Sequence, residues 1–206
     1  TRMDRDIGRI LDLIDDLGLS ENTLVLFSSD NGPSWVGGVD HAFFRSSGDL
    51  RGRKAQVWEG GLRVPTIARW PGTIPPGTTT DHVSAFQDVF PTFAELAGAE
   101  VPEGLDGISF VPTLLGHSER QANHTHLYWE YARRWQAVRM GRWKGVKQEV
   151  RKNPDAPLEL YDLASDIGET TNVANDHPDI VTRLNEIMIH GRDEPTVEAF
   201  RFGRYQ

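Results

Sequence analysis

The feature that most constrains the fold is an amphipathic segment that leads directly into a continuous apolar run. Apolar residues recur at helical spacing over residues 7–17, with Asp and Arg on the other face, and Gly18 is typical of a helix end. Residues 23–28 (TLVLFS) then form a short, largely apolar run. A helix followed at once by such a run predicts a buried parallel strand in an α/β sheet.

The pattern of predicted secondary structure changes near residue 120. Before it, we predict a strand from Leu62 to Trp70, a helix with Asp88 as its N-terminal cap, and a short helix at 110–115. After it, short aromatic-rich runs separated by turns predict an antiparallel meander, with strands at 127–131, 136–140, 143–147 and 158–163. Pro178 opens a last helix. An α/β piece is therefore expected before residue 120 and a smaller α+β piece after it.

Composition excludes several classes of function. The 206 residues carry 22 Lys and Arg against 30 Asp and Glu, so nucleic acid is not expected as the main partner, because phosphate binding needs clustered basic residues. With no cysteine, a disulfide framework, a thiolate metal site and a cysteine nucleophile are excluded within these residues. No apolar run approaches the ~18 residues that cross a bilayer, and no membrane partner is expected. The first residues are neither a signal peptide nor an initiator Met, so we interpret the chain as the later part of a longer protein.

The strongest local motif is SSDNG at residues 28–32, where the predicted strand ends. Ligands gather at the carboxyl ends of strands in open α/β sheets. The Asp30 carboxylate and the Asn31 amide offer two hard oxygens, which suit Ca²⁺ or Mg²⁺. Asp-Asn-Gly is also ordinary turn chemistry, and a turn without a ligand is the competing interpretation.

Residues 31–63 are expected to form a long structured loop, and this loop carries the second motif, LRGRK at 50–54. A bound metal and the Lys54 ammonium together could hold a sulfate or phosphate from two sides. A solvated basic loop is the competing interpretation. In the WEGG sequence at 58–61, the two glycines are expected to shape a turn that enters the next strand, with Glu59 and Arg63 as salt-bridge or hydrogen-bond partners.

Two further residues are candidates for substrate binding. His41 lies in the same loop and could face a ligand there, because loops often carry function. Trp129 is either a platform for a sugar or aryl ring or, like most aromatic residues, part of the core. His124 and His126 lack metal-ligand spacing with another His or carboxylate, which favours surface or structural roles.

Taken in order, these motifs resemble type I sulfatases, the arylsulfatase-like members of the alkaline phosphatase superfamily, in their C-terminal portion. The residues that carry the resemblance are 29–33 (SDNGP), 50–54 (LRGRK), 58–65 (WEGGLRVP), 91–98, 106–109, 128–131, 136–144 and 159–163. The resemblance implies an α/β fold in which residues 1–120 are the C-terminal part of the catalytic, alkaline-phosphatase-like sheet-and-helix domain. Residues 121–206 would be a small α+β C-terminal subdomain with an antiparallel sheet and a terminal helix.

The resemblance also implies hydrolysis of a sulfate ester on a carbohydrate or aryl group. By matching position, Asp30 and Asn31 would be ligands of Ca²⁺, and Lys54 would bind the sulfate oxygens. The nucleophile of the family is a formylglycine made within a Cys/Ser-x-Pro-x-Arg motif, which this chain lacks. The motif, the early aspartate pair and the catalytic histidines are expected upstream, in a missing N-terminal part of the same protein. The chain alone is therefore predicted to be inactive.

Two other functions remain open. A phosphate or phosphonate monoester hydrolase of the same superfamily is the nearest alternative, because the fold alone does not settle the group transferred. The other is a non-catalytic, sulfatase-derived binding protein. For the sulfatase, the expected partner is a sulfated small molecule or glycan, and the resemblance implies a periplasmic or extracellular location.

Overall fold

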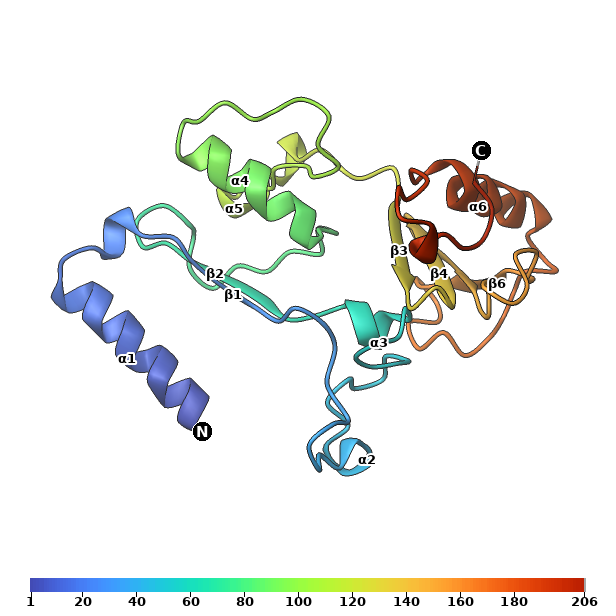
Figure 1. The fold of residues 1–206 in the computed structure, drawn as a ribbon. Coiled ribbons are helices and arrows are strands. Elements are labelled where there is room, and N and C mark those ends of the chain that lie inside the picture. Colours follow the sequence, from blue (N-terminus) through green and yellow to red (C-terminus); the bar gives the residue numbers. More distant parts are fainter. Residues whose placement is uncertain (206) are drawn as a thin grey trace. The chain divides into compact units, whose positions relative to one another are not determined.

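The computed structural model describes residues 1–205, whose helices and strands are drawn in Figure 1. They form two compact units: Thr1–Ser28 with Pro65–His124, and Ser29–Val64 with the described residues from Thr125 onward. The loop at 29–64 thus belongs with the C-terminal residues and not with its sequence neighbours. The assignment of 1–120 and 121–206 to two domains of a larger enzyme stays a prediction.

The first unit contains a long helix, a two-stranded sheet and several short helices. Helix α1 (Arg2–Asp16) covers the predicted amphipathic segment, and the Thr1 hydroxyl accepts the Asp4 N–H at its start. The other elements are η1 (Ser20–Asn22), β1 (Val25–Ser28), β2 (Thr66–Arg69), η2 (Phe86–Asp88), α4 (Val89–Leu96), α5 (Val111–Leu114) and η3 (Ser118–Arg120). In the part of the chain that the structure describes, no helix has the length and apolar character needed to cross a membrane.

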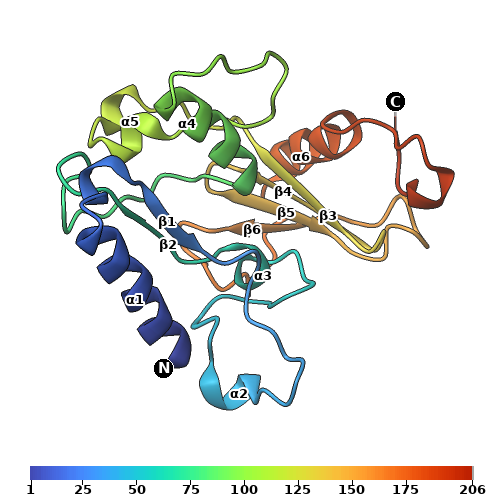
Figure 2. The same ribbon diagram turned by 60° about the vertical axis from the view of Figure 1, so that its left-hand side comes forward.

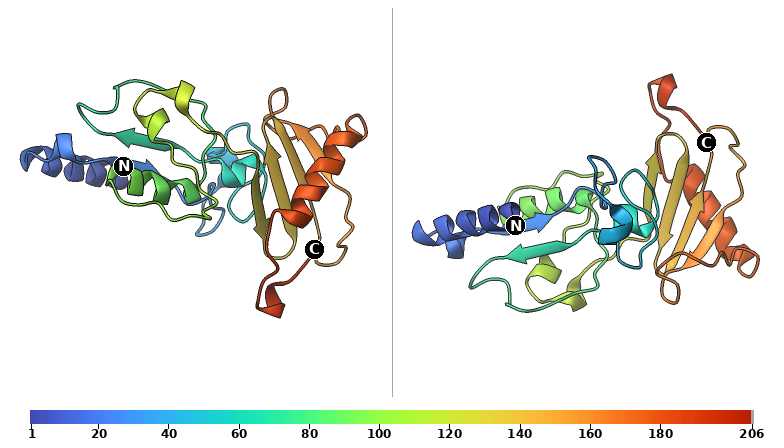
Figure 3. Two further views of the ribbon diagram at one scale, coloured as in Figure 1. Left: turned by 90° about the horizontal axis from the view of Figure 1, so that it is seen from above. Right: turned by 90° about the horizontal axis from the view of Figure 1, so that it is seen from below.

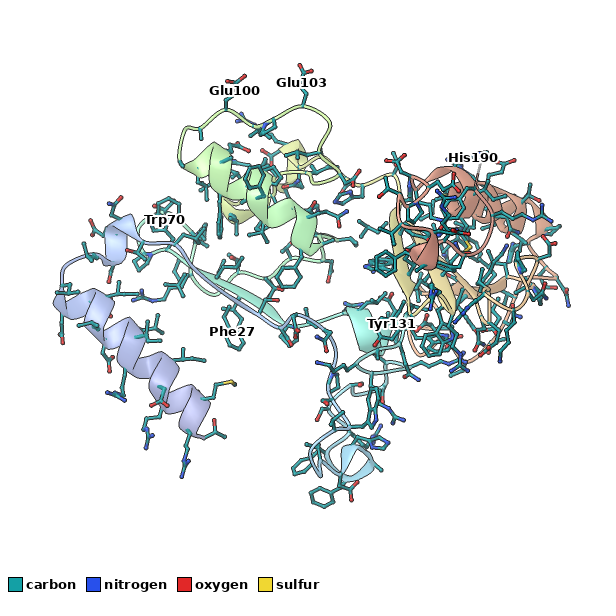
Figure 4. The ribbon with its side chains drawn as sticks, viewed as in Figure 1. Phe27, Trp70, Glu100, Glu103, Tyr131 and His190 are labelled. Carbon is teal, nitrogen blue, oxygen red and sulfur yellow. The ribbon has the colours of Figure 1, made fainter. Side chains whose placement is uncertain are left out.

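The prediction of a buried parallel strand at residues 23–28 is wrong. β1 runs antiparallel to β2, with Val25 opposite Arg69 and Ser28 opposite Thr66. Within residues 1–205 this sheet has two strands, and Phe27 is 37% exposed and projects from the ribbon in Figure 4. An apolar run indicates a strand, but the direction of its neighbour depends on a segment far along the chain.

Asp88 occupies the N-cap position of α4, as predicted, but its side chain is used elsewhere. Helix α4 begins without a side-chain cap. The buried Asp88 carboxylate instead accepts the backbone N–H groups of Ala85 at 2.7 Å and Ile108 at 2.8 Å, and lies 2.9 Å from His124 Nε2. Because a buried carboxylate needs several partners, it ties these three segments of the first unit together. His124 therefore has a structural role, as predicted.

The second unit is built on a four-stranded antiparallel sheet in the order β3–β4–β5–β6, visible in Figure 2. The elements of this unit are α2 (His41–Phe44), α3 (Glu59–Leu62), β3 (Leu127–Tyr131), β4 (Trp135–Met140), β5 (Trp143–Lys147), β6 (Glu159–Asp162), α6 (Pro178–His190) and η4 (Glu198–Phe200). The strand positions confirm the predicted meander, and α6 confirms the helix opened by Pro178.

Both faces of the four-stranded sheet are covered. Successive residues of a strand point to opposite faces, so Ala137 and Val138 of β4 join different hydrophobic clusters. One face packs against Val57 and Trp58, which precede α3. The other packs against Leu184 of α6, which crosses the sheet in both views of Figure 3. This two-sided burial explains why the central strands carry apolar residues on both faces.

Candidate active site

The loop that carries Asp30 and Asn31 is held by hydrogen bonds at its main chain. The Ser29 hydroxyl donates to the Asn31 carbonyl oxygen at 2.8 Å, and the Gly32 N–H donates to the Gly61 carbonyl oxygen at 2.9 Å. The Asp30 side chain is exposed and that of Asn31 is half-buried. Neither forms a hydrogen bond or ion pair with any residue from 1 to 205. Their oxygens are therefore accessible to a ligand.

Three glycines allow this loop to approach α3 more closely than other residues would. A Cβ on Gly32 would lie 1.9 Å from the Gly60 carbonyl oxygen. A Cβ on Gly60 would lie 2.5 Å from the Gly52 oxygen, and one on Gly61 would lie 2.1 Å from the Gln56 oxygen. Such distances leave no room for a side chain. The WEGG glycines therefore do more than shape a turn, because they pack α3 between residues 29–33 and 51–56.

Lys54 lies on the segment next to this loop. Its backbone N–H donates to the Pro33 carbonyl oxygen at 3.0 Å, and the following residue, Ala55, has a left-handed backbone with φ 68°. The Lys54 side chain is exposed and forms no ion pair with a described carboxylate. The structure thus brings together the segments that carry Asp30, Asn31 and Lys54. Their ligand and anion-binding roles stay predictions.

The two candidate substrate contacts differ in their surroundings. His41 is exposed at the start of α2, whose first turn is capped by the Asp40 carboxylate through the Phe43 N–H at 2.9 Å. Trp129 is half-buried in β3 and packs against the hydrophobic cluster around Trp58. The Lys144 ammonium lies 4.9 Å from the centre of the Trp129 ring. Trp129 therefore contributes to the core, and a substrate role for either residue stays a prediction.

The oxygen donors of the site fit part of a calcium centre. Calcium takes about 6–8 oxygen ligands, of which Asp30 would supply carboxylate oxygens and Asn31 an amide oxygen. Across residues 1–205, no group of three or more His, Cys, Asp or Glu side chains is arranged to hold a metal. Asp30 and Asn31 are thus compatible with a calcium ion whose other ligands come from elsewhere in the protein.

A buried ionic cluster, which we call the α3 anchor, joins α3 to the sheet; it consists of Glu59, Arg139, Lys144 and Glu169. The Lys144 ammonium lies 2.8 Å from one Glu59 oxygen, and an Arg139 guanidinium nitrogen lies 3.3 Å from the other. The Glu59 N–H donates to Glu169 Oε2 at 2.7 Å. Glu59 is 2% exposed, and Lys144 and Glu169 are fully buried. Charges at this depth persist only when they are paired.

Burial and neighbouring charges have opposite effects on the carboxyl groups of the α3 anchor. Burial acts to raise the pKa of Glu59, but Lys144 and Arg139 outweigh it and leave the pKa below its usual value. Burial raises the pKa of Glu169 to about 7, since Lys144 and the Glu59 N–H offset only part of the desolvation. Within residues 1–205, Glu169 Oε1 has no hydrogen-bond partner. Glu59 is therefore an anion at neutral pH, whereas Glu169 titrates near neutrality.

The sequence identified one member of the α3 anchor and missed the others. Glu59 was expected to form a salt bridge, which is confirmed, but its partners lie in β4 and β5, far along the chain. One signal for Lys144 is present: it shares a face of β5 with the buried Val146, an unusual position for a charge. No local pattern indicates Glu169, which follows β6 in a turn.

Comparison with known proteins places these motifs in a family. Residues 1–99 match the family model "Sulfatase", and residues 52–194 match the model described as "N-sulphoglucosamine sulphohydrolase, C-terminal". The chain is 35% identical to human arylsulfatase A over 217 residues, which cover 91% of this chain and 41% of that protein. It is 31% identical over 205 residues to the N-acetylgalactosamine-6-O-sulfatase of Bacteroides thetaiotaomicron, covering 91% of this chain and 40% of that protein.

The fold is also similar to that of a solved structure, BT33336S-sulf, which comes from work on the metabolism of multiple glycosaminoglycans by Bacteroides thetaiotaomicron. The similarity covers 90% of this chain and 42% of the solved chain, with a TM-score of 0.75 and 32% sequence identity. The chain therefore spans about two fifths of the length of these relatives. The agreement in fold confirms an α/β architecture of the alkaline phosphatase type. The chain belongs to the sulfatase family, and most of it corresponds to the C-terminal region of that family's N-sulphoglucosamine sulphohydrolase model.

Proposed function

We propose that the protein to which this chain belongs hydrolyses sulfate esters, with Asp30 and Asn31 as calcium ligands and Lys54 as the cation that binds the sulfate group. The observation that carries this proposal is a pair of backbone hydrogen bonds, from Gly32 to Gly61 and from Lys54 to Pro33. They bring two motifs of the family together on adjacent segments. Membership of the sulfatase family supports sulfur as the centre of reaction.

Each residue of the site would contribute through its charge. The Asp30 carboxylate and the Asn31 amide oxygen would hold the calcium ion, while Lys54 would orient the sulfate and balance the negative charge that builds on its oxygens. A single such donor in a dry site is worth about 3–4 kcal/mol of transition-state stabilisation. When bound, calcium would supply further positive charge, and a formylglycine upstream of this chain would supply the nucleophile.

A sulfated carbohydrate or an aryl sulfate is the substrate class we propose. It is supported by the names of relatives, which include arylsulfatase A and an N-acetylgalactosamine-6-O-sulfatase. His41 would contact the organic part of the substrate from the exposed start of α2. Trp129 would do so from β3 through the part of its ring that the core leaves uncovered. We further propose a periplasmic or extracellular location.

The test is a paired assay on the full-length protein that contains this chain. We expect turnover of an aryl sulfate and a sulfated monosaccharide, and much slower turnover of the matched phosphate monoesters. Calcium titration by calorimetry should show binding that is lost in Asp30→Ala, whereas Glu186→Gln, an exposed site on α6, should bind calcium normally.

Three results would contradict the proposal. Preference for phosphate would favour the phosphohydrolase alternative. Absence of turnover, together with an intact gene that lacks a formylglycine motif, would favour a non-catalytic binding protein. Unchanged calcium affinity in Asp30→Ala would remove that residue from the metal site.

A further inference from the structure

The α3 anchor neutralises an arrangement that would be unfavourable by itself. In the register of the sheet, Arg139 of β4 lies directly opposite Lys144 of β5. Like charges in directly opposed positions destabilise a sheet. The Glu59 carboxylate contacts both cations, one with each oxygen, at 3.3 and 2.8 Å. A pair of apolar residues would cover this face of the sheet at least as well, because buried ion pairs seldom exceed well-packed apolar groups in stability. The specific contribution of the α3 anchor is therefore geometric, because its ion pairs fix the position of α3 against the sheet.

Two residues, Glu169 and Arg51, further restrict α3 and the segment before it. Glu169 has a left-handed backbone with φ 51°, which is costly for a residue other than glycine, and its carboxylate accepts the Glu59 N–H. Its carbonyl oxygen accepts a hydrogen bond from the Arg51 guanidinium at 2.9 Å. The same guanidinium donates to the Tyr161 hydroxyl at 2.8 Å and lies 4.4 Å from the centre of the Trp58 ring. The start of the Lys54 segment is thereby attached to β6 and to the turn after it.

From α3, short contacts lead to both segments of the candidate site. The Gly60 N–H donates to the Arg51 carbonyl oxygen at 2.7 Å, and the Gly61 carbonyl oxygen accepts the Gly32 N–H. Because the glycines leave no free space at these contacts, a shift of α3 must displace residues 29–33, residues 51–56 or both.

We propose that the Glu59–Lys144 ion pair is a positioning element of the candidate active site, which fixes α3 so that the loop of Asp30 and Asn31 and the loop of Lys54 keep their relative placement. This inference rests on the proposed function for its effect on catalysis. Its structural part, the restriction of residues 29–34 and 52–62, is independent of any activity.

The test compares two double variants of the full-length protein. Glu59→Gln/Lys144→Met removes both charges of the pair, so neither of its two residues is left as an unpaired buried ion. The matched control, Glu130→Gln/Arg192→Met, removes another ion pair of the same unit, at 2.8 Å, which joins β3 to the segment after α6. Amide hydrogen exchange, measured by mass spectrometry, and steady-state kinetics with an aryl sulfate are recorded for both.

For Glu59→Gln/Lys144→Met we expect faster exchange confined to peptides covering 29–34 and 52–62, and a fall in kcat of about 10- to 100-fold with KM little changed, because small misplacement of reacting groups is costly. The control should alter neither quantity. If the double variant loses cooperative unfolding, Lys144→Met alone is used, since Glu59 then keeps Arg139 as its partner.

Unchanged exchange at 29–34 and 52–62 in a folded variant overturns the inference, as does equal loss of kcat in the control. If wild-type protein hydrolyses no sulfate ester, the proposed function fails, while the exchange comparison still decides whether the ion pair positions these loops.

Discussion

At the scale of single residues, the charge of Lys54 is the most direct link between the sequence and the proposed chemistry. Its side chain is exposed, whereas the backbone around it is fixed by the hydrogen bond to Pro33. This combination suits a group that must reach an anion from a defined position. The neighbouring Ala55 takes a left-handed backbone, which shows that the segment is held in a specific path.

We predict that Lys54→Ala in the full-length protein lowers kcat toward an aryl sulfate by about 10²–10³, because one oxyanion-binding donor is lost. Calcium affinity should stay unchanged, since the ligands are elsewhere. Lys152→Ala, which removes an exposed lysine of the same unit, is the control and should keep full activity. Wild-type kcat in Lys54→Ala would exclude this lysine from the site.

Glu169 gives a prediction of pH dependence. The charged groups that face it are Lys144, Arg51 and Glu59, and burial raises its pKa to about 7 from an ordinary value of 4.5. Between these values the folded state holds the proton more tightly than the unfolded state. The contribution of Glu169 to the free energy of unfolding is thus greatest below pH 4.5 and is lost as the pH rises through 7.

Urea unfolding of wild type and Glu169→Gln between pH 4.5 and 8 measures this effect. The variant stays neutral, so its stability relative to wild type should rise by about 3 kcal/mol across the range. Glu186→Gln, at an exposed position, should show no such trend. A difference between wild type and Glu169→Gln that does not vary with pH would contradict the raised pKa.

At the scale of elements, the sheet of the second unit shows what a sequence can specify. Its strand positions follow from short aromatic-rich runs separated by turns, and the predicted bounds of β3 agree with the observed Leu127–Tyr131. Pairing of β3 with β4 and of β4 with β5 is then settled because the short turns at 132–134 and 141–142 join them. The strand at 23–28 lacks that local constraint, and its predicted parallel neighbours are wrong. It pairs antiparallel with β2, which is shorter than the strand predicted from Leu62 to Trp70.

The residues of the candidate site also differ in how far the local sequence predicts them. Asp30, Asn31 and Lys54 are candidates from the sequence because each lies in a short, ordered motif, and their roles stay predictions. Glu59 was expected to pair, but Lys144 could not be matched to it, since the contact joins α3 to β5 across a long stretch of chain. Contacts of this kind depend on how the sheet is assembled and leave little trace in local sequence.

Helix α6 offers a test of how strongly an element depends on one side chain. Leu184 is fully buried against the sheet, and a Cβ on Gly145 of β5 would lie 2.9 Å from its Cδ1 atom. We predict that Leu184→Ala lowers the free energy of unfolding by about 2–5 kcal/mol, measured by urea denaturation, because a cavity is left in the packed interior. Arg183→Ala, at the exposed neighbouring position, should change it by less than about 0.5 kcal/mol. Equal effects of the two substitutions would show that α6 is not packed as described.

At the scale of the whole molecule, the two units differ in how they are stabilised. Both clusters of buried hydrophobic residues found within residues 1–205 belong to the second unit. In the first unit, α1 has no buried residue and β1 pairs with one strand. A two-stranded sheet is only marginally stable in water, whereas a sheet covered on both faces is protected.

We therefore predict uneven amide hydrogen exchange in this chain. Amides of β4 and β5 should exchange slowest, and those of α1 and β1 should exchange faster by several orders of magnitude, because they open without disrupting a core. Mass spectrometry with peptides covering 2–28 and 135–147 measures the difference. Equal protection of both sets would show that the first unit is stabilised as strongly as the second.

The close packing of the glycines also limits how this protein can be recombined with its relatives. A crossover placed between Pro33 and Arg51 would take Gly32 from one parent and Gly60 and Gly61 from the other. A Cβ at any of these positions would come too close to a carbonyl oxygen. Each parent must therefore have glycine at the position that it contributes, or the chimera will not fold. Residues 29–62 are therefore best exchanged as one block.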